Sequence, residues 1–454
     1  MERAALSDKI ILLCDRWSPD SDLLHVSLLK AGCDCVAVSL EENDFLPENV
    51  LSMYDMLSGE LPGKEENRRK PRFFNEIAVP DHWTINAGNR TSGNITYQQE
   101  EKGKIYYWQE GKNYLVEAVD WYDRKGRVRF RDHYNRHGNI CARTVYDADG
   151  CALCKTRFSE SGKEILTENL VTGDMMLYVD GTMKIFRSKV EMLTFWFIRK
   201  KVNQNRIFYN SLSIPFFISN RLEGVGSQDI LFWQEPVGQE IPWNMQMILK
   251  GASGRTERIM VQKRSSYEKL LKLGADRSKI HLLGFIYPFR KNNGYTPEAL
   301  ICTNSELIEH GEELIRALPW MHFHIAAITA MSSRLMELGN YENVSLYPGA
   351  VPNVQRELFH KCDYYFDINH GSEIISAVRQ AFLHNQLIFA FQETIHNRDY
   401  VTEEHIYPIE KFERMLQDVR TVMQDVEKMR RDLEEQRKYA VAENERTYAD
   451  LLEL

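Results

Sequence analysis

Hydrophobic and polar positions alternate in two different ways along this chain. Near its start, an apolar run at residues 10–14 precedes a segment, 21–31, with apolar residues at helical spacing, and a second apolar run follows at 34–39. Short buried strands that alternate with helices are typical of parallel α/β units. Because the same alternation returns after residue 187 and continues to about residue 408, we expect doubly wound parallel sheets in most of the chain.

Turn-forming tetrads recur between these α/β regions. Each tetrad ends in glycine, and the four glycines lie twelve residues apart, at Gly126, Gly138, Gly150 and Gly162. A glycine at the end of a tight turn supplies the positive φ that hairpins need, and the segments between the turns are rich in β-branched and aromatic residues. The spacing therefore predicts an antiparallel β-meander that interrupts the α/β pattern.

The last stretch of the chain is charged and carries apolar residues on one side, which predicts one long helix. Two doubly wound halves closed by a C-terminal helix are the architecture of GT-B glycosyltransferases. We therefore predict an α/β, GT-B-like fold of two Rossmann-type halves with an inserted antiparallel β-meander domain. The expected boundaries are 1–70 with 188–257 for the first half, 71–187 for the β-rich add-on domain, 258–408 for the second half and 409–454 for the C-terminal helix.

Composition narrows the possible functions. The 454 residues are 43% hydrophobic and 27% charged, which is ordinary for a soluble globular protein. A net charge of -8 without a dense cluster of Lys and Arg argues against nucleic acid as a partner. The apolar run at 10–14 is too short for a signal-peptide core or a membrane span, so we expect a cytoplasmic protein.

The eight cysteines are scattered along the chain. Cys151 and Cys154 have the spacing of a metal or redox pair, but no second such pair and no pair of histidines accompanies them. We interpret the cysteines as reduced thiols and expect no metal site.

The second half lacks the residues that a sugar-nucleotide donor requires. A diphosphate needs cations or a helix N-terminus, and a ribose needs a carboxylate. GT-B enzymes that retain configuration use an Arg, a Lys and two Glu eight positions apart. The four corresponding positions here hold Asn304, Glu309, His370 and Val378. Glu373 could replace one glutamate, but a carboxylate near a helix N-terminus is the simpler interpretation, so we predict no catalysis and no cofactor.

Aromatic and amide side chains gather after a predicted strand of the first half. Trp233, Gln234 and Glu235 come directly after it, and Trp243 and Asn244 follow. Such side chains suit a peptide or a glycan, with a packed loop as the alternative interpretation. The candidate acceptor-binding residues are Asn210, Trp233, Gln234, Glu235, Trp243, Asn244, His370 and Gly371.

The meander carries candidate contacts to a partner. Arg129 and Arg131 are most simply the solvated face of a strand, but they can equally mark a subunit interface. With Tyr134 and Tyr146 they would present charge and aromatic surface at exposed strand edges, which suits pairing with another chain.

Several long stretches resemble one protein family. They are Asp22 to Leu28, Asp44-Phe45-Leu46-Pro47, Lys70 to Asn75, Arg131 to Asn135, Glu168 to Asp174, Tyr209 to Ser213 and Ile230 to Pro236. With these stretches the chain resembles the stabilising B subunits, of the GtfB type, of the bacterial glycosyltransferase that starts O-glycosylation of serine-rich repeat adhesins. It departs from the pattern at Glu41-Glu42-Asn43, which lacks the usual double Asp and Gly, and at Trp243, where a small residue is common.

The resemblance implies a non-catalytic subunit, a pseudo-glycosyltransferase. It would pair with a catalytic A subunit that transfers N-acetylglucosamine from UDP to Ser or Thr, stabilise that subunit and hold the serine-rich acceptor polypeptide. The family uses its β-rich domain for assembly and works at the cytoplasmic face of the membrane before accessory Sec export, which implies a peripheral membrane contact. Two alternatives stay open: an active GT-B enzyme with an altered donor site around Arg290, Lys291, His370 and Glu373, and a general chaperone without acceptor specificity.

Overall fold

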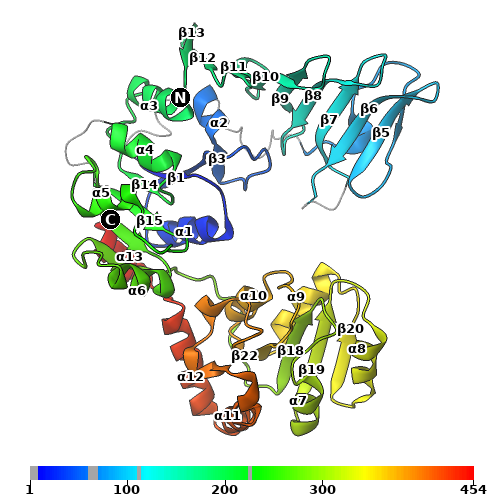
Figure 1. Cartoon of the computed structure of the whole chain (residues 1–454), viewed down its shortest axis with the longest axis vertical. Coiled ribbons are helices and arrows are strands. Elements are labelled where there is room, and N and C mark those ends of the chain that lie inside the picture. Colours follow the sequence, from blue (N-terminus) through cyan, green and yellow to red (C-terminus); the bar gives the residue numbers. More distant parts are fainter. Residues whose placement is uncertain (1–8, 60–69, 110–113, 223–227) are drawn as a thin grey trace. The chain divides into compact units, whose positions relative to one another are not determined.

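The computed structural model describes residues 9–59, 70–109, 114–222 and 228–454, and it divides into two compact units (Figure 1). The first unit holds the chain up to Met260 except residues 30–32, and the second holds residues 30–32 and 261–454. None of the helices in these described ranges combines the length and the apolar character needed to cross a membrane.

A sheet of seven strands, most of which lie in the first unit, has the order β17-β16-β15-β14-β1-β2-β3. Its strands are β1 (Ile10–Cys14), β2 (Cys35–Ser39), β3 (Val50–Ser52), β14 (Ile207–Tyr209), β15 (Asp229–Trp233), β16 (Thr256–Val261) and β17 (Ile280–Leu282). β1 pairs in parallel with both β2 and β14, so the strand order reverses direction beside β1. In such sheets the carboxyl ends of the strands form a crevice at this switch point.

Helices accompany these strands, as the alternating pattern predicted. They are α1 (Pro19–Lys30), α2 (Met53–Ser58), α3 (Lys189–Arg199), α4 (Ile214–Arg221), α5 (Trp243–Leu249) and α6 (Arg264–Lys272). The sheet order differs from the predicted grouping in one respect, because β16 and β17 extend this first sheet and not the second. The alternation of strands and helices is uninterrupted there, so the local pattern contains no signal that assigns a strand to one sheet or the other.

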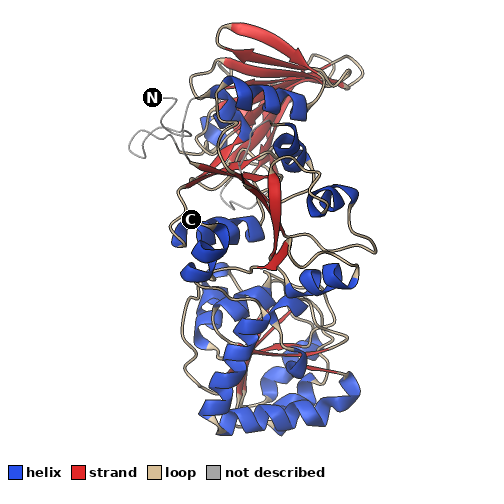
Figure 2. Cartoon of the chain, turned by 90° about the vertical axis from the view of Figure 1, so that its left-hand side faces the viewer, coloured by secondary structure: helices blue, strands red, loops and turns tan. Residues whose placement is uncertain are grey.

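Ten strands in the described part of the add-on region form one antiparallel sheet, ordered β4 to β13 exactly as in the sequence, which confirms the predicted meander (Figures 1 and 2). They are β4 (Thr84–Asn86), β5 (Ser92–Tyr97), β6 (Glu100–Tyr107), β7 (Val116–Tyr122), β8 (Val128–Tyr134), β9 (Ile140–Tyr146), β10 (Ala152–Phe158), β11 (Glu164–Asn169), β12 (Met175–Val179) and β13 (Thr182–Phe186). The outermost strands are β4 and β13.

The repeated tetrads form one turn type four times. In the first, the amide of Gly126 donates to the carbonyl of Asp123 at 3.1 Å and the amide of Asp123 donates to the carbonyl of Arg127 at 2.8 Å. The same pair of bonds recurs in the other three turns, and the four glycines have φ between 72° and 84°. This is the three-residue hairpin in which a left-handed residue follows a type I turn, so glycine avoids the steric cost there.

The second unit contains a parallel sheet with the order β20-β19-β18-β21-β22-β23. The strands are β18 (Glu298–Thr303), β19 (His322–Ala327), β20 (Val344–Tyr347), β21 (Tyr364–Asp367), β22 (Leu387–Phe391) and β23 (Ile406–Tyr407), and the helices between them are α7 (Gly311–Ala317), α8 (Ser333–Glu337), α9 (Pro352–Lys361) and α10 (Ala377–Leu383). Phe323, Phe366 and Phe389 are fully buried in its core, because helices cover both faces of a parallel sheet.

The prediction of one long C-terminal helix is wrong. The segment forms α11 (Phe412–Gln424), α12 (Val426–Tyr439) and α13 (Glu445–Leu452). Asp425 has an extended backbone, and its side chain accepts from the amides of Glu427 and Lys428, so it ends one helix and caps the next. Asn444 caps α13 in the same way through the amide of Thr447.

Candidate functional site

A pocket of about 660 Å³ lies at the carboxyl ends of β1, β14 and β15 in the first unit. Its described lining residues are Asp15, Arg16, Ser18, Asp20, Asn210, Ser211, Leu212, Ser213, Trp233, Gln234, Glu235, Pro236, Pro242 and Asn244. We call it the strand-end pocket. It lies where a doubly wound sheet ordinarily binds its ligand, because three strand ends and the start of α1 converge there.

The structure brings five of the predicted acceptor-binding residues together in this pocket, namely Asn210, Trp233, Gln234, Glu235 and Asn244. Trp243 is not among the described lining residues, although its neighbours Pro242 and Asn244 are. Its side chain is 61% exposed, and its ring lies 6.1 Å from that of Phe217.

The amide side chains of the pocket bond within the protein. The Oδ1 atom of Asn210 accepts from the amide of Asp15 at 3.0 Å, and its Nδ2 atom donates to Ser21 at 3.0 Å and to Gln234 at 3.3 Å. The Nε2 atom of Gln234 donates to the carbonyl of Asp20 at 3.1 Å. Asn210 and Gln234 therefore fix the three strand ends to the start of α1.

Asn244 behaves in the same way. Its Nδ2 atom donates to the carbonyl of Leu212 at 2.6 Å, and its Oδ1 atom accepts from the amide of Met245 at 3.1 Å. These internal bonds show that the amides shape the pocket, and their contact with an acceptor stays a prediction. Only the long-range contacts reveal this use.

Trp233 offers an unused hydrogen-bond donor. Its side chain is 3% exposed, and its Nε1 atom finds no acceptor in the described part of the chain. A buried polar atom without a partner costs free energy, and the protein covers this N–H. Carboxylates of Asp15, Asp20 and Glu235 also line the pocket and can accept from hydroxyl and amide groups.

His370 and Gly371 belong to the second unit, where they follow β21. The Nε2 atom of His370 lies 2.5 Å from Oε2 of Glu309, and its amide donates to the carbonyl of Leu307 at 3.1 Å. A Cβ atom on Gly371 would lie 1.9 Å from Oδ1 of Asn304, so the Asn304 side chain would have to move to admit one. Of the positions that correspond to the donor-binding residues of GT-B enzymes, His370 and Glu309 thus bond to each other.

Glu373 occupies the place of an anion. Its Oε1 atom accepts from the amide of Val378 at 3.0 Å, at the first turn of α10, and burial raises the pKa of Glu373. Helix N-termini bind phosphate through such amides. Because a carboxylate already accepts from this amide, a diphosphate here would meet a like charge, which agrees with the simpler interpretation of Glu373.

The two cations of the alternative donor site also have structural partners. The Nζ atom of Lys291 lies 2.6 Å from Oδ1 of Asp363, a residue that is 1% exposed, and 2.6 Å from the carbonyl of Cys362. Arg290 donates to Gln380 at 2.9 Å. Lys291 therefore neutralises a buried carboxylate and does not offer its charge to a ligand.

Sequence reasoning missed His396. Its Nδ1 atom lies 2.6 Å from Oδ1 of Asp367, its Nε2 atom lies 2.7 Å from the carbonyl of Gly371, and its amide donates to Oδ2 of Asp367 at 2.7 Å. The hydrogen bond with Asp367 raises the pKa of His396 to about 9, against the effect of burial. No motif precedes this histidine in the sequence, so only the fold reveals the pair.

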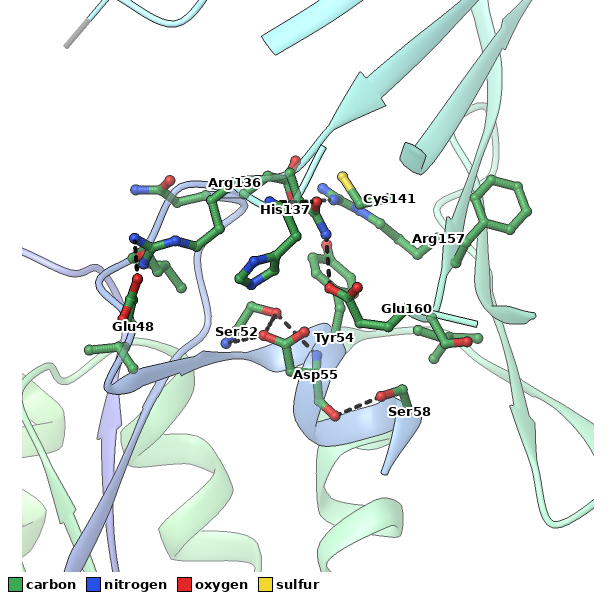
Figure 3. Close-up of a pocket in the computed structure, with 18 of the residues that line it drawn as sticks. Glu48, Ser52, Tyr54, Asp55, Ser58, Arg136, His137, Cys141, Arg157 and Glu160 are labelled. Carbon is green, nitrogen blue, oxygen red and sulfur yellow. Dashed lines mark hydrogen bonds and ion pairs between the residues drawn. The ribbon is translucent and has the colours of Figure 1, made fainter. Parts of the chain in front are cut away.

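A second cavity lies within the first unit, where the loop after β2 meets the meander (Figure 3). The guanidinium of Arg157 is 3% exposed; its Nη1 atom lies 2.8 Å from Asp44, its Nη2 atom lies 3.1 Å from Glu42, and its Cζ atom lies 4.1 Å from the ring centroid of Tyr54. We call this cluster the Arg157 seam. The cavity itself is only about 60 Å³, room for a few water molecules.

Charge holds the Arg157 seam together. Burial would raise the pKa of Glu42, but Arg157 and Lys155 lower it to about 2, so the carboxylate is ionised at neutral pH. Arg136 adds a backbone bond from its amide to the carbonyl of Asp44 at 3.0 Å, and Phe45 stacks on Trp108 with ring centroids 4.6 Å apart. The Asp44-Phe45-Leu46-Pro47 motif therefore attaches the α/β sheet to the meander.

The candidate partner contacts do not lie on edge strands, which corrects that expectation. Arg129, Arg131 and Tyr134 belong to β8 and Tyr146 ends β9, both inside the sheet. Tyr134 is 4% exposed, and Arg131 bonds to Asp120 at 2.6 and 2.8 Å, so neither presents a free side chain. Arg129 is exposed and donates to the carbonyl of Tyr146 at 3.4 Å.

The described ranges contain no group of three or more His, Cys, Asp or Glu side chains that could hold a metal ion. Cys151 and Cys154 are free thiols at the start of β10.

Models of four protein-family domains match this chain. They are described as the GtfB N-terminal domain (residues 11–56), the GtfB middle domain (83–187), the GtfB third domain (189–273) and the GftB/GlyA-F C-terminal domain (299–436). The chain is also similar to a solved structure described as a GtfA/B complex bound to UDP and GlcNAc, with 36% identity, a TM-score of 0.83, and coverage of 98% of this chain and 99% of that one. The pneumococcal O-GlcNAc transferase GtfA in complex with UDP and GlcNAc has 12% identity and a TM-score of 0.61, which supports the GT-B-like fold alone.

Two relatives are named UDP-N-acetylglucosamine--peptide N-acetylglucosaminyltransferase stabilizing protein GtfB. The Streptococcus gordonii protein is 37% identical over 401 residues, which is 88% of each chain. The Streptococcus agalactiae protein is 38% identical over 409 residues, which is 90% of this chain and 91% of that one. With identity at this level along nearly the whole of both sequences, the chain belongs to the GtfB family of transferase-stabilizing proteins.

Proposed function

We propose that this chain is the non-catalytic subunit of a peptide O-GlcNAc transferase, in which it stabilises a catalytic GT-B subunit and holds a Ser/Thr-rich acceptor polypeptide. The observation that carries the proposal is the contrast between the two units. The strand-end pocket of the first unit is open and lined by polar side chains, whereas His370 and Glu309, at donor-like positions of the second unit, bond to each other.

We expect no binding of a sugar-nucleotide donor, because the groups that would bind its diphosphate are already in use within the protein. The helix N-terminus that would face a diphosphate is occupied by Glu373, and Lys291 is paired with Asp363. These two contacts disfavour the alternative of an active enzyme with an altered donor site. Isothermal titration of the purified chain with UDP-N-acetylglucosamine is expected to give no heat of binding, and micromolar affinity would contradict the proposal.

Holding the acceptor is the proposed role of the strand-end pocket. An extended polypeptide offers hydroxyl and amide protons to carboxylates that line the pocket, such as that of Asp15. Exposed Trp243 can add a stacking surface beside the pocket. His370 and Gly371 remain predicted acceptor contacts of the second unit, where Glu309 would orient the imidazole.

Assembly through the meander is supported by its outermost strand. Met183 and Ile185 of β13 are 51% and 61% exposed, and an apolar edge strand is a surface that a strand of another chain can cover. By its family, the natural acceptor would be a serine-rich repeat adhesin, modified in the cytoplasm or at the membrane surface before export.

Reconstitution tests both roles. The chain is co-expressed with a catalytic GtfA-type subunit, the mass of the complex is measured by light scattering, and transfer to a Ser/Thr-rich peptide is assayed with each subunit omitted in turn. Transfer should require the catalytic subunit and rise when this chain is present. A chain that binds the catalytic subunit but no peptide would be a general chaperone.

Ile185→Lys serves as the interface variant in this experiment. It should weaken assembly, because a charge replaces an exposed apolar side chain on the edge strand. Leu29→Lys is the matched control, since Leu29 is 46% exposed on α1, outside the meander. If both variants assemble equally well, β13 is not the interface.

A further inference from the structure

We infer that the outermost meander strand, β13, is covered in the transferase complex by a strand of the catalytic subunit in which apolar and acidic residues alternate. The inference rests on the proposed assembly through the meander and adds the chemistry of the partner's surface. β13 pairs with β12 on one side, and no strand in the described part of the chain pairs with its other side.

The two faces of β13 differ in character. Met183 and Ile185 are exposed on one face, where Tyr178 of β12 lies opposite Met183. Side chains alternate between the two faces of a strand, so Lys184 lies on the other face. There its Nζ atom lies 4.5 Å from the ring centroid of Phe195 on α3. A strand added along this edge would meet apolar side chains on one face and an ammonium group on the other.

The charge around β13 is positive, although the whole chain carries a net charge of -8. Residues 174–201 contain six basic and three acidic side chains. Asp180, at the turn between β12 and β13, already pairs with Arg199 and Lys200 at 3.0 and 3.2 Å. The Lys184 side chain is exposed and makes no ion pair within the described ranges, so its charge is open to a carboxylate of a partner.

The edge of β13 favours a strand of a different protein over a membrane or a second copy of this chain. An outermost strand presents backbone N–H and C=O groups that another strand can bond and that lipid tails cannot. Lys184 is the central residue of β13, so a symmetric antiparallel pair of two copies would place two ammonium groups opposite each other. A strand with carboxylates toward Lys184 and apolar side chains toward Met183 and Ile185 matches both faces.

Zero-length cross-linking of the complex with the catalytic subunit tests the contact directly. A carbodiimide joins a lysine amine to a carboxylate in contact with it, with loss of water, and peptide mass spectrometry identifies the two residues. We expect a cross-link between Lys184 and an Asp or Glu of the catalytic subunit. Apolar residues should stand directly before and after that acidic residue in the partner's sequence.

Affinity measurements assign the effect to charge. At low salt, Lys184→Glu should weaken binding of the catalytic subunit at least about tenfold and Lys184→Gln should weaken it less, since opposite charges across an interface attract. The wild-type affinity should fall as salt rises, because salt screens exposed charges. Lys125→Glu is the matched control, since Lys125 is exposed in the turn between β7 and β8, and it should leave the affinity unchanged. Circular dichroism checks that the variants are folded.

Three outcomes would overturn a different part of this assignment. If the complex forms without a cross-link from Lys184, and Lys184→Glu binds as tightly as the wild type, the inference is wrong while assembly stands. If Lys184→Glu loses binding to phosphatidylserine vesicles but keeps its affinity for the catalytic subunit, β13 faces a membrane and the inference is also wrong. If the two subunits form no complex, the proposed function fails with it.

Discussion

At the scale of single residues, the imidazole of His396 is held between the carboxylate of Asp367 and the carbonyl of Gly371. Both contacts require a proton on the ring nitrogen that faces them, so the doubly protonated ring is favoured. The pair lies beside Glu373, whose carboxylate occupies the start of α10. Side chains of a donor-like site therefore serve to hold the second unit together.

This pair predicts a pH dependence. The pKa of His396 is raised to about 9 from 6.5, so its stabilisation is complete below pH 6.5 and is lost as the pH rises through about 9. The thermal unfolding midpoint of the second unit should fall across this range in the wild type, and His396→Gln should abolish that part of the fall. His360→Gln, at an exposed histidine on α9, should not change it. A pH profile that is the same in all three proteins would contradict the assignment.

At the scale of elements, four turns of one type differ in their surroundings, which makes them a matched series. A Cβ atom on Gly138 would lie 2.7 Å from the carbonyl oxygen of Lys70, whereas one on Gly150 would meet nothing within 4 Å. Both residues have positive φ, at 73° and 84°.

Alanine substitutions at Gly150 and Gly138 should separate the cost of a strained backbone from the cost of a steric clash. Gly150→Ala is expected to cost about 1–2 kcal/mol, the price of a left-handed conformation for a residue with a Cβ atom. Gly138→Ala should cost more, because the segment at Lys70 and Arg72 must also move. Urea unfolding of the two variants measures the difference. If both variants lose the same free energy of unfolding, the segment at Lys70 and Arg72 moves aside without a measurable cost.

The Arg157 seam is the element that sets how the meander sits on the first α/β sheet. Arg157→Met keeps an aliphatic contact with Tyr54 but leaves Glu42 and Asp44 without their guanidinium. Breaking a buried ion pair costs about 3–5 kcal/mol. In hydrogen exchange, the amides of the loop after β2 and of β10 should lose protection while those of the second unit keep it.

Arg143→Met is the control for the seam. Arg143 pairs with Asp132, which is 3% exposed, but both residues lie within the meander. Replacement of Arg143 should lower the hydrogen-exchange protection of the amides in β8 and β9, and the amides of the loop after β2 should stay protected. If both variants release that loop, the seam is not a separate structural element.

At the scale of the whole molecule, the described residues form three sheets, and the meander and the sheet of the second unit have separate hydrophobic cores. The meander core includes Ile95, Ile105 and Val119, and the core of the second unit is built around Phe323, Phe366 and Phe389. Separate cores allow one part to be removed without unfolding the others.

Deletion of residues 72–186 is therefore expected to abolish association with the catalytic subunit and leave the α/β sheets folded. Circular dichroism and size-exclusion chromatography check the fold, and co-purification checks the association. The stack of Phe45 on Trp108 is lost in this variant, so a modest fall in the unfolding midpoint is also expected. Normal assembly of the shortened chain would exclude the meander as the interface.

Local patterns in the sequence determined the element types of this protein. Helical and alternating periodicities distinguish its α/β parts from its meander, and the twelve-residue glycine spacing fixes the turns, because each depends on neighbours in the chain. The lack of cations between residues 299 and 315 is likewise visible in the sequence. Five of the eight candidate acceptor residues line one pocket, since strand ends in a parallel sheet share an edge.

Only the tertiary structure decided how those side chains are used. Asn210, Gln234 and Asn244 bond internally, Tyr134 is buried, and β16 and β17 join the first sheet. Each of these outcomes depends on atoms that are distant in the sequence, and local periodicity carries no record of which distant groups meet. The sequence alone therefore determined the kinds of element and the missing donor chemistry, and tertiary contacts decided which polar groups remain for a ligand.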